Sequence, residues 1–170
     1  KGVMVEHASV SNYMNWLHGY LDLDDQSASD CSSNIAFDFT LSVSIASLIK
    51  GHKVCLCSDD KKKDLSEYVQ HLIDNNIRYA KLTPGYLSVL LEHIKGVGIK
   101  LPLKKIILGG EATLHPCFKD LTALVKQHVK QVKFLTDAKF KEGDEEFLDW
   151  IEKEDLVLGL SIDSERSDKK

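Results

Sequence analysis

The sequence has no apolar run approaching the roughly 20 residues that a membrane-spanning helix needs. Its net charge of −4 lacks the basic excess that nucleic acids and membrane surfaces favour, so we expect neither as a partner. Residues 1–7 do not have the form of a signal peptide. The first residue is Lys1 rather than methionine, and we expect the chain to begin within a longer protein.

Cysteine is scarce, and its spacing does not favour a metal site. The 4 cysteines form no Cys-x-x-Cys pair. Cys55 and Cys57 are two positions apart in an apolar run, so on a strand they would share a face as small core side chains. We therefore assign no metal ligand. Free thiols of this kind are typical of proteins in a reducing cytoplasm, where we expect this one.

The apolar pattern predicts helices that alternate with short strands. A chain of 170 residues with a hydrophobic fraction of 43% is large enough to bury a core. The expected strands are residues 33–37, 52–57, 78–83, 105–108, 130–135 and 156–162. The expected helices are residues 9–21, 38–50, 64–75, a segment beginning at Pro84, 115–128 and 144–154. This alternation predicts an α/β fold, a mostly parallel sheet with helices on both faces.

Four polar or glycine-bearing segments lie where an expected strand gives way to a helix. They are residues 37–40, 82–86, 108–112 and 136–137. Because carboxyl ends of parallel strands meet at one edge of a sheet, we expect these segments to gather there. Asp38 is either a plain N-cap or a carboxylate that pairs with a substrate ammonium, and Ser42 would share its helix face. Gly109-Gly110, with the two residues that follow, would either line a groove open to solvent that admits a flat ligand or form an ordinary turn.

Together these segments resemble the adenylation (AMP-binding) domains of nonribosomal peptide synthetases, within the adenylate-forming enzyme superfamily. Residues 1–7 look like the end of the family's glycine-rich phosphate loop and its continuation. Residues 34–40 are similar to the Phe-Asp-x-Ser motif, and residues 81–86 to the Leu-Thr-Pro-Ser-Tyr segment. Residues 107–112 look like the Gly-Gly-Glu-Ala segment. The motifs follow the family's order, so we expect residues 1–135 to form part of an adenylation-domain core.

The resemblance implies an amino-acid pocket and an adenine wall. The positions that match the family's substrate pocket are Asp38, Phe39, Ser42, Lys81, Ile107 and Gly109. Those that match its nucleotide-binding wall are Gly110, Glu111 and Ala112. By this match Asp38 would pair with the substrate's α-ammonium, and Lys81 would select the side chain of aspartate or asparagine. Alternatively, Lys81 extends to solvent and selects nothing.

The chain departs from the family beyond Phe134, where the Asn-x-Tyr-Gly-Pro-Thr-Glu motif with its magnesium-binding glutamate has no match. Most of the phosphate loop, the ribose-binding aspartate and the C-terminal lysine also lack a counterpart. We read residues 136–170 as a divergent continuation with one helix, one strand and a polar tail. We therefore assign no catalytic residue, and expect the chain alone to form no aminoacyl adenylate.

The resemblance also implies the partners of the parent domain. These are an amino acid, ATP with magnesium, and the carrier-protein domain of the same synthetase, although this chain by itself need bind no cofactor. Sheet edges left bare would invite self-association. The alternative is a non-catalytic α/β binding or scaffold module derived from an adenylation domain. An intact glycine-rich loop directly upstream of Lys1 would favour the adenylation-domain fragment over this non-catalytic module.

Overall fold

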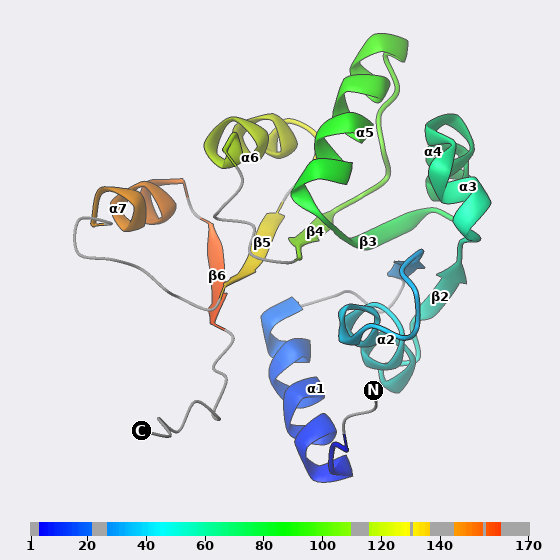
Figure 1. Cartoon of the computed structure of the whole chain (residues 1–170), viewed down its shortest axis with the longest axis vertical. Coiled ribbons are helices and arrows are strands. Elements are labelled where there is room, and N and C mark those ends of the chain that lie inside the picture. The colour runs from blue at the N-terminus through cyan, green and yellow to red at the C-terminus, as the bar shows by residue number, and fades with distance from the viewer. Residues whose placement is uncertain are drawn as a thin grey trace, which may run out of the picture. The chain divides into compact units, whose positions relative to one another are not determined.

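The computed structural model describes residues 4–21, 27–109, 116–129, 131–136, 145–154 and 156–160. The chain divides into two compact units. The first comprises Lys1–Lys81 and Leu101–Leu103, and the second comprises Leu82–Lys100 and Lys104–Lys170. The strand pairs described within each unit are parallel and alternate with helices along the chain, which confirms the predicted α/β class (Figure 1).

The first unit is built on three parallel strands in the order β2-β1-β3. Its elements are α1 (His7–Leu21), β1 (Ala28–Cys31), the 3₁₀ helix η1 (Asp38–Ser42), α2 (Ile45–Ile49), β2 (Lys53–Leu56), α3 (Asp59–Lys63), α4 (Leu65–Asp74) and β3 (Ile77–Leu82). In the register of these strands Asp30 lies opposite Cys55, and Ser29 lies opposite Tyr79. The strand predicted at residues 78–83 is thus confirmed as β3.

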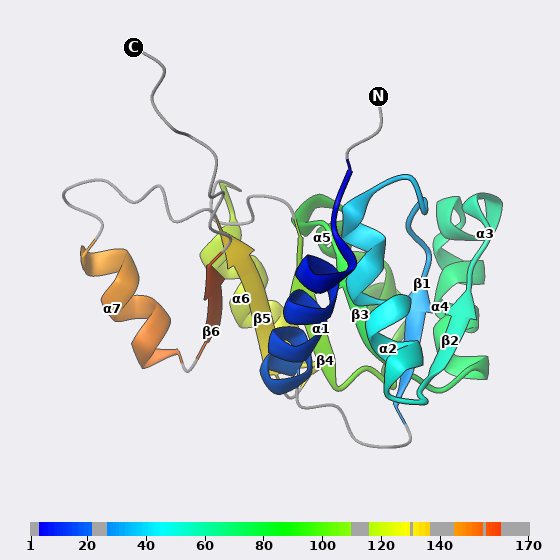
Figure 2. The ribbon, with the colours of Figure 1, turned by 90° about the horizontal axis from the view of Figure 1, so that it is seen from below.

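Helices cover both faces of the first unit's strands. Ser29 and Asp30 are consecutive in β1, so their side chains point to opposite faces. Ser29 Oγ donates a hydrogen bond of 2.7 Å to the carbonyl of Val43, on the side of η1 and α2. Asp30 instead accepts hydrogen bonds from Tyr68 and His71 of α4. Figures 1 and 2 show α1 and α2 on one side of these strands and α4 on the other.

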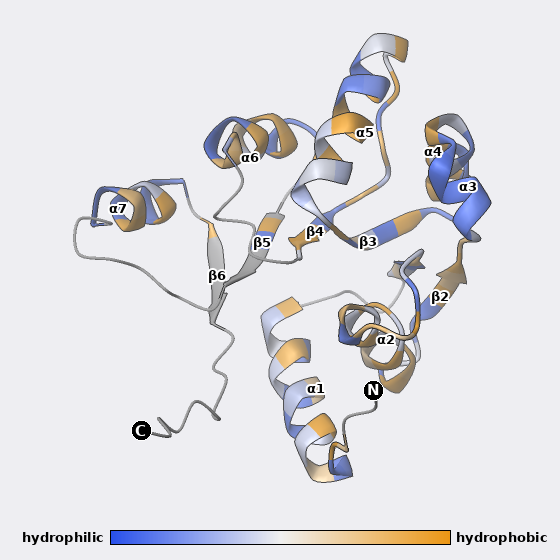
Figure 3. Cartoon of the chain, in the orientation of Figure 1, coloured by the Kyte–Doolittle hydropathy of each residue, from blue (hydrophilic) through white to orange (hydrophobic). Residues whose placement is uncertain are grey.

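The core of the first unit comes from one stripe of α1 and one of α4. Met14, Leu17 and Leu21 are buried on α1, and Tyr68 and Leu72 on α4. Figure 3 shows the apolar residues gathered along one side of α4. The helix begins after Asp64, whose side chain accepts hydrogen bonds from the backbone N–H of residues 66 and 67 at 2.9 and 3.1 Å. This N-cap satisfies two donors that the first turn leaves free.

The second unit contains three parallel strands in the order β4-β5-β6. Its elements are α5 (Pro84–Val97), β4 (Lys105–Leu108), α6 (Phe118–Lys126), β5 (Gln131–Thr136), α7 (Glu145–Lys153) and β6 (Val157–Leu160). Pro84 opens α5 as predicted, and the Thr83 side chain caps it. The helix ends at Gly98, whose φ of +66° suits a residue without a Cβ.

Helix α7 packs on α6 through aromatic side chains. The rings of Phe118, Phe147 and Trp150 lie with centroids 5.8 to 6.0 Å apart. Lys126 Nζ also contacts the Glu154 carboxylate at 2.9 Å. The helix and strand predicted after residue 136 are therefore present within the described residues. The domain boundary placed at residue 135 stays a prediction, since the compact units divide after residue 81.

Two predicted elements near the first motif are wrong. The strand expected at residues 33–37 is a loop in which Ile35 and Phe37 are 90% and 65% exposed, and the strand lies earlier, at β1. The helix expected at residues 38–50 is split into η1 and α2. Asp38 does not cap it, because the N-cap position is Phe37 and no side chain bonds there. A 3₁₀ helix has about 3 residues per turn, so positions four apart diverge; Asp38 is exposed while Ser42 is buried.

Candidate functional site

Four of the predicted pocket residues lie together in the first unit. Asp38, Phe39 and Ser42 belong to η1, and Lys81 stands near the end of β3. Lys81 Nζ lies 4.3 Å from the centroid of the half-buried Phe39 ring. At that distance the ammonium is attracted to the negative face of the ring. The residues that the motifs predicted as pocket members thus include a cation, Lys81, that lies over the aromatic ring of Phe39. The carboxylate of Asp38 directly precedes Phe39 in the chain.

Lys81 is buried, with only 7% of its surface exposed. The alternative in which Lys81 extends to solvent is therefore wrong for this structure. Among the residues that the structure describes, no carboxylate is within ion-pair distance of its amine. Burial lowers the pKa of Lys81 to about 8, and the nearby Asp38 carboxylate acts in the opposite direction. The Asp38 charge is thus close enough to act on Lys81, although the two do not form an ion pair.

Two tyrosines adjoin this cluster. Tyr79 precedes Lys81 by two positions on β3, so both side chains point to the same face. The Tyr79 hydroxyl is fully buried and lies near the Ser42 hydroxyl without completing a hydrogen bond. Burial raises the pKa of Tyr79, and Ser42 lowers it. On α1, the pKa of Tyr13 is raised by burial and then by the Asp38 carboxylate.

Sequence reasoning missed both tyrosines. Tyr13 belongs to the apolar stripe of α1 and was interpreted only as part of a helix. The period of two along β3 could have placed Tyr79 on the same face as Lys81. The hydroxyl of each tyrosine adds a polar group to a face whose other members are a cation and a carboxylate. Ser42 itself donates a hydrogen bond of 3.1 Å to the Phe39 carbonyl, which ties it to η1.

The remaining predicted residues belong to the second unit or lie outside the described residues. Ile107 is fully buried in β4. Gly109 follows β4, and its N–H donates a hydrogen bond of 2.9 Å to the Leu82 carbonyl. Two of the strand-to-helix junctions therefore meet as expected. We expected Gly109 to be open to solvent, and it is buried instead. Gly110, Glu111 and Ala112 lie outside the described residues.

The part of the chain that the structure describes offers no group of three His, Cys, Asp or Glu side chains placed to hold a metal ion. Within the same described residues, no helix has the length and apolar character to cross a membrane.

Comparison with known families identifies the chain. The model of the AMP-binding enzyme family matches residues 1–133. The chain belongs to the AMP-binding enzyme family. Bacitracin synthase 1 of Bacillus licheniformis is 29% identical over 114 residues, which cover 66% of this chain and 2% of that protein. Bacitracin synthase 3 of the same species is 26% identical over 172 residues, which cover 95% of this chain and 3% of that protein.

Tyrocidine synthase 3 of Brevibacillus parabrevis is 25% identical over 112 residues, which cover 66% of this chain and 2% of that protein. The resemblance to the adenylation domains of peptide synthetases, drawn from the motifs, is thus confirmed. The chain spans 2% to 3% of the length of these three relatives.

Solved structures share the fold of this AMP-binding chain. The N-terminal domain of FACL13 from Mycobacterium tuberculosis is similar with a TM-score of 0.62 at 17% identity, covering 79% of this chain and 33% of that one. The crystal structure of CmiS6 is similar with a TM-score of 0.56 at 18% identity, covering 69% of this chain and 28% of that one. At these identities the likeness shows a shared architecture only.

Proposed function

We propose that this chain is an interior part of an adenylation domain that activates an amino acid with ATP for peptide synthesis. The observation that carries the proposal is the first unit's cluster: a buried Lys81 amine over Phe39, with the exposed Asp38 carboxylate nearby. A site with separate positive and negative groups suits a ligand that has both charges. An amino acid is such a ligand.

In the reaction of the parent domain, a carboxylate oxygen of the amino acid attacks the α-phosphorus of ATP, and pyrophosphate leaves. The residues of this chain would contribute binding rather than chemistry. Asp38 would hold the α-ammonium through a charge-assisted pair. On the resemblance alone, Phe39 and Ile107 are proposed as apolar walls, and Gly109 as the position that leaves space. The nucleotide-binding role of Gly110, Glu111 and Ala112 is proposed on the resemblance alone.

The proposed selectivity for aspartate or asparagine rests on the burial of the Lys81 ammonium and its lack of a carboxylate partner among the described residues. A buried ammonium without a carboxylate partner is unfavourable, because burial removes its hydration. The side-chain carboxylate of aspartate, or the amide oxygen of asparagine, would supply that partner. A large apolar side chain would leave the ammonium unpaired. Lys81 would therefore disfavour such substrates by on the order of 1–3 kcal/mol, the typical cost of one unpaired buried polar group.

We further propose that the 170-residue chain forms no adenylate by itself and works in a longer protein with a carrier-protein domain. The motifs that handle phosphate and magnesium in the family have no counterpart in this sequence. Its four free cysteines fit a cytoplasmic setting. Self-association through sheet edges would appear as a concentration-dependent mass in sedimentation experiments.

Amino-acid-dependent exchange between ATP and pyrophosphate tests this function. The protein that carries this chain should exchange most strongly with aspartate or asparagine. A Lys81→Ala variant should lose that preference, while a Lys63→Ala variant, altered at an exposed residue of α3, should keep it. Best activation of a large apolar amino acid would refute the selectivity. Absence of exchange with every amino acid would favour the non-catalytic scaffold.

A further inference from the structure

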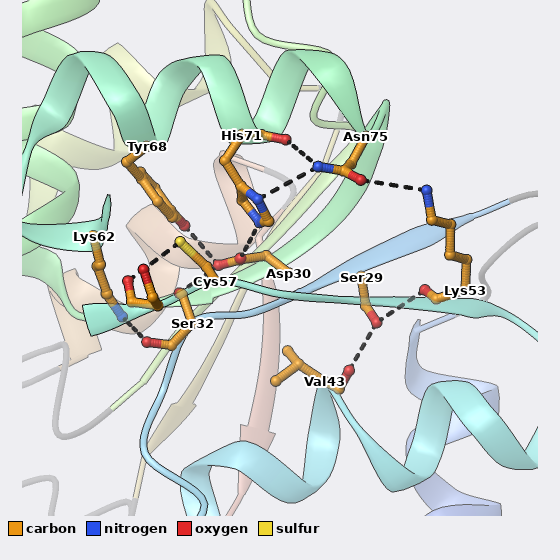
Figure 4. Close-up of polar contacts among 11 residues, drawn as sticks. Ser29, Asp30, Ser32, Val43, Lys53, Cys57, Lys62, Tyr68, His71 and Asn75 are labelled. Atoms are coloured by element: carbon orange, nitrogen blue, oxygen red, sulfur yellow. Dashed lines mark hydrogen bonds and ion pairs between the residues drawn. The ribbon is translucent and has the colours of Figure 1, made fainter. Parts of the chain in front are cut away.

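On the face of β1 opposite the candidate site, Asp30 is the centre of a buried polar network (Figure 4). Its side chain has 0% exposure. Three donors converge on its carboxylate. Ser32 Oγ and Tyr68 Oη donate to Oδ2 at 2.5 and 2.6 Å, and His71 Nε2 lies 3.2 Å from Oδ1. Such a carboxylate is held in one orientation, because rotating it would break bonds in a site that water does not reach.

The Asn75 amide sets which nitrogen of His71 carries the proton. The Asn75 amide has its oxygen 3.3 Å from Lys53 Nζ, which can only donate. Its nitrogen lies 3.0 Å from the His71 carbonyl, which can only accept. Both contacts assign the same orientation to the amide, so its N–H₂ also faces His71 Nδ1 at 3.4 Å. Nδ1 is therefore the acceptor, and the proton sits on Nε2, where it is donated to Asp30.

The other end of the network fastens the chain as it leaves β1. Ser32 is held twice, by its hydroxyl on Asp30 and by its carbonyl, which accepts a 2.9 Å hydrogen bond from Lys62 Nζ. Just before it, the Cys31 carbonyl accepts from the Cys57 N–H at 3.2 Å. Residues 34–38, which follow, are all exposed. Ser32 is thus the anchor from which the loop toward η1 departs.

We propose that Asp30 is a positioning residue for the candidate amino-acid site: through Ser32 it sets where the following loop places Asp38 and Phe39 against Lys81. Naming that site as an amino-acid site rests on the proposed function. The positioning role itself rests on the contacts of the network. The Asp30 side chain points away from η1, so its effect on η1 passes through the backbone that follows Ser32.

The competing explanation is that the Asp30 network only stabilises the fold. The free energy of unfolding distinguishes this role from positioning of the loop. Replacing a buried ionic network by apolar side chains of similar volume is often neutral or stabilising. What such a replacement removes is the specification of one geometry. A variant that keeps stability and loosens the loop would therefore isolate positioning from folding.

Hydrogen exchange of the protein that carries this chain tests the proposal. Asp30→Asn places an N–H₂ group among three donors, and His71 cannot adapt, because Asn75 fixes its proton on Nε2. We expect backbone exchange in residues 33–42 to rise about tenfold or more, while α5 in the second unit is unchanged. Asp60→Asn, at a side chain that is 96% exposed, is the matched control. It should change the exchange neither of residues 33–42 nor of α5. Unchanged exchange in residues 33–42 overturns the proposal.

Two further variants keep the test valid if Asp30→Asn unfolds. The triple variant Asp30→Leu, Tyr68→Phe, His71→Leu should retain the unfolding midpoint and still expose residues 33–42 to faster exchange. Equal acceleration throughout the first unit would mean that the network only stabilises. In the double variant D30N/N75D the direction of donation through His71 is reversed. The residue 30 amide would donate to Nε2, and Nδ1 would donate to the residue 75 carboxylate. This double variant should recover part of the lost protection, and a loop that exchanges as fast as in D30N alone contradicts the role given to His71.

Kinetics then connect the network to the site. In the ATP–pyrophosphate exchange assay, the triple variant should raise the KM for the amino acid about tenfold and leave the KM for ATP unchanged. If the KM for the amino acid and the KM for ATP rise equally, or if neither rises, the link to the amino-acid site is overturned. If the unsubstituted protein shows no exchange at all, the proposed function fails, while the hydrogen-exchange result still decides whether Asp30 positions the loop.

Discussion

The buried amine of Lys81 should make the stability of the chain depend on pH. Its pKa falls from an ordinary value of 10.5 to about 8 because burial disfavours the charged form. The folded state therefore releases this proton at a lower pH than the unfolded state does. Between pH 8 and 10.5 the unfolded state binds more protons, so this group makes stability rise with pH across that window. Below pH 8 the penalty is present in full.

The size of the effect follows from the two pKa values. The gap between 10.5 and about 8, at about 1.4 kcal/mol for each pH unit, gives a penalty of about 3 kcal/mol. Lys81→Met removes this penalty and also the attraction to the Phe39 ring, which is on the order of 1 kcal/mol. We expect the variant to be more stable than the unsubstituted chain by about 2 kcal/mol at pH 7, and most of that advantage to disappear by about pH 10.

Urea unfolding of both chains at pH 7, 8, 9 and 10 measures this difference, and other titrating groups cancel in the comparison. Lys63→Met is the matched control, because the Lys63 side chain is 77% exposed and should give a difference independent of pH. A difference between Lys81→Met and the unsubstituted chain that stays constant across the series would refute the assignment of a buried, uncompensated ammonium. At pH 7 the amine is still mostly charged, as a partner for an acidic substrate requires.

Three further predictions concern single contacts. Asp38→Asn in the parent protein should lower amino-acid-dependent pyrophosphate exchange at least about tenfold through KM, because it removes the carboxylate proposed to pair with the ammonium. Asp64→Ala should lower the free energy of unfolding by about 1 kcal/mol in urea titrations, since the N-cap of α4 is lost. Lys126→Met should change it by less than about 1 kcal/mol, because its pair with Glu154 is partly exposed.

Strands and helices with clear periodicity could be predicted from the sequence. β4 matches its predicted span of residues 105–108 at both ends, and β2, β3, β5 and α4 each deviate by one residue at either end. Pro84 marks a helix start as expected, and Gly51, with a φ of +73°, follows the end of α2 close to the predicted helix end at residue 50. These signals are local, so the sequence contains them directly.

The first strand could not be predicted, because what makes it a strand is far away in the sequence. Residues 28–31 read Ala-Ser-Asp-Cys, and two of the four side chains are polar. They are buried because Val43 accepts from Ser29, while Tyr68 and His71 donate to Asp30. The apolar residues Ile35 and Phe37 looked more like a strand and are exposed. Composition alone does not reveal which polar groups will be satisfied after folding.

The candidate site was predicted in part. The order of motifs placed Lys81 near Asp38, and the Asp38 carboxylate raises the pKa of Lys81 against the larger, lowering effect of burial. The contact of Lys81 with the Phe39 ring was not foreseen, because η1 was expected to be an α-helix with different side-chain directions. The Asp30 network was also missed, since its members come from separate elements and match no local pattern.

Amino-acid-dependent exchange of pyrophosphate into ATP tests the central claim most directly. The claim is that this chain forms part of a domain that activates an amino acid. The account predicts exchange by the protein that carries the chain, strongest with aspartate or asparagine, and none by residues 1–170 alone. Robust exchange by the isolated chain above a heat-killed control, or exchange by the whole protein with no amino acid, would contradict it.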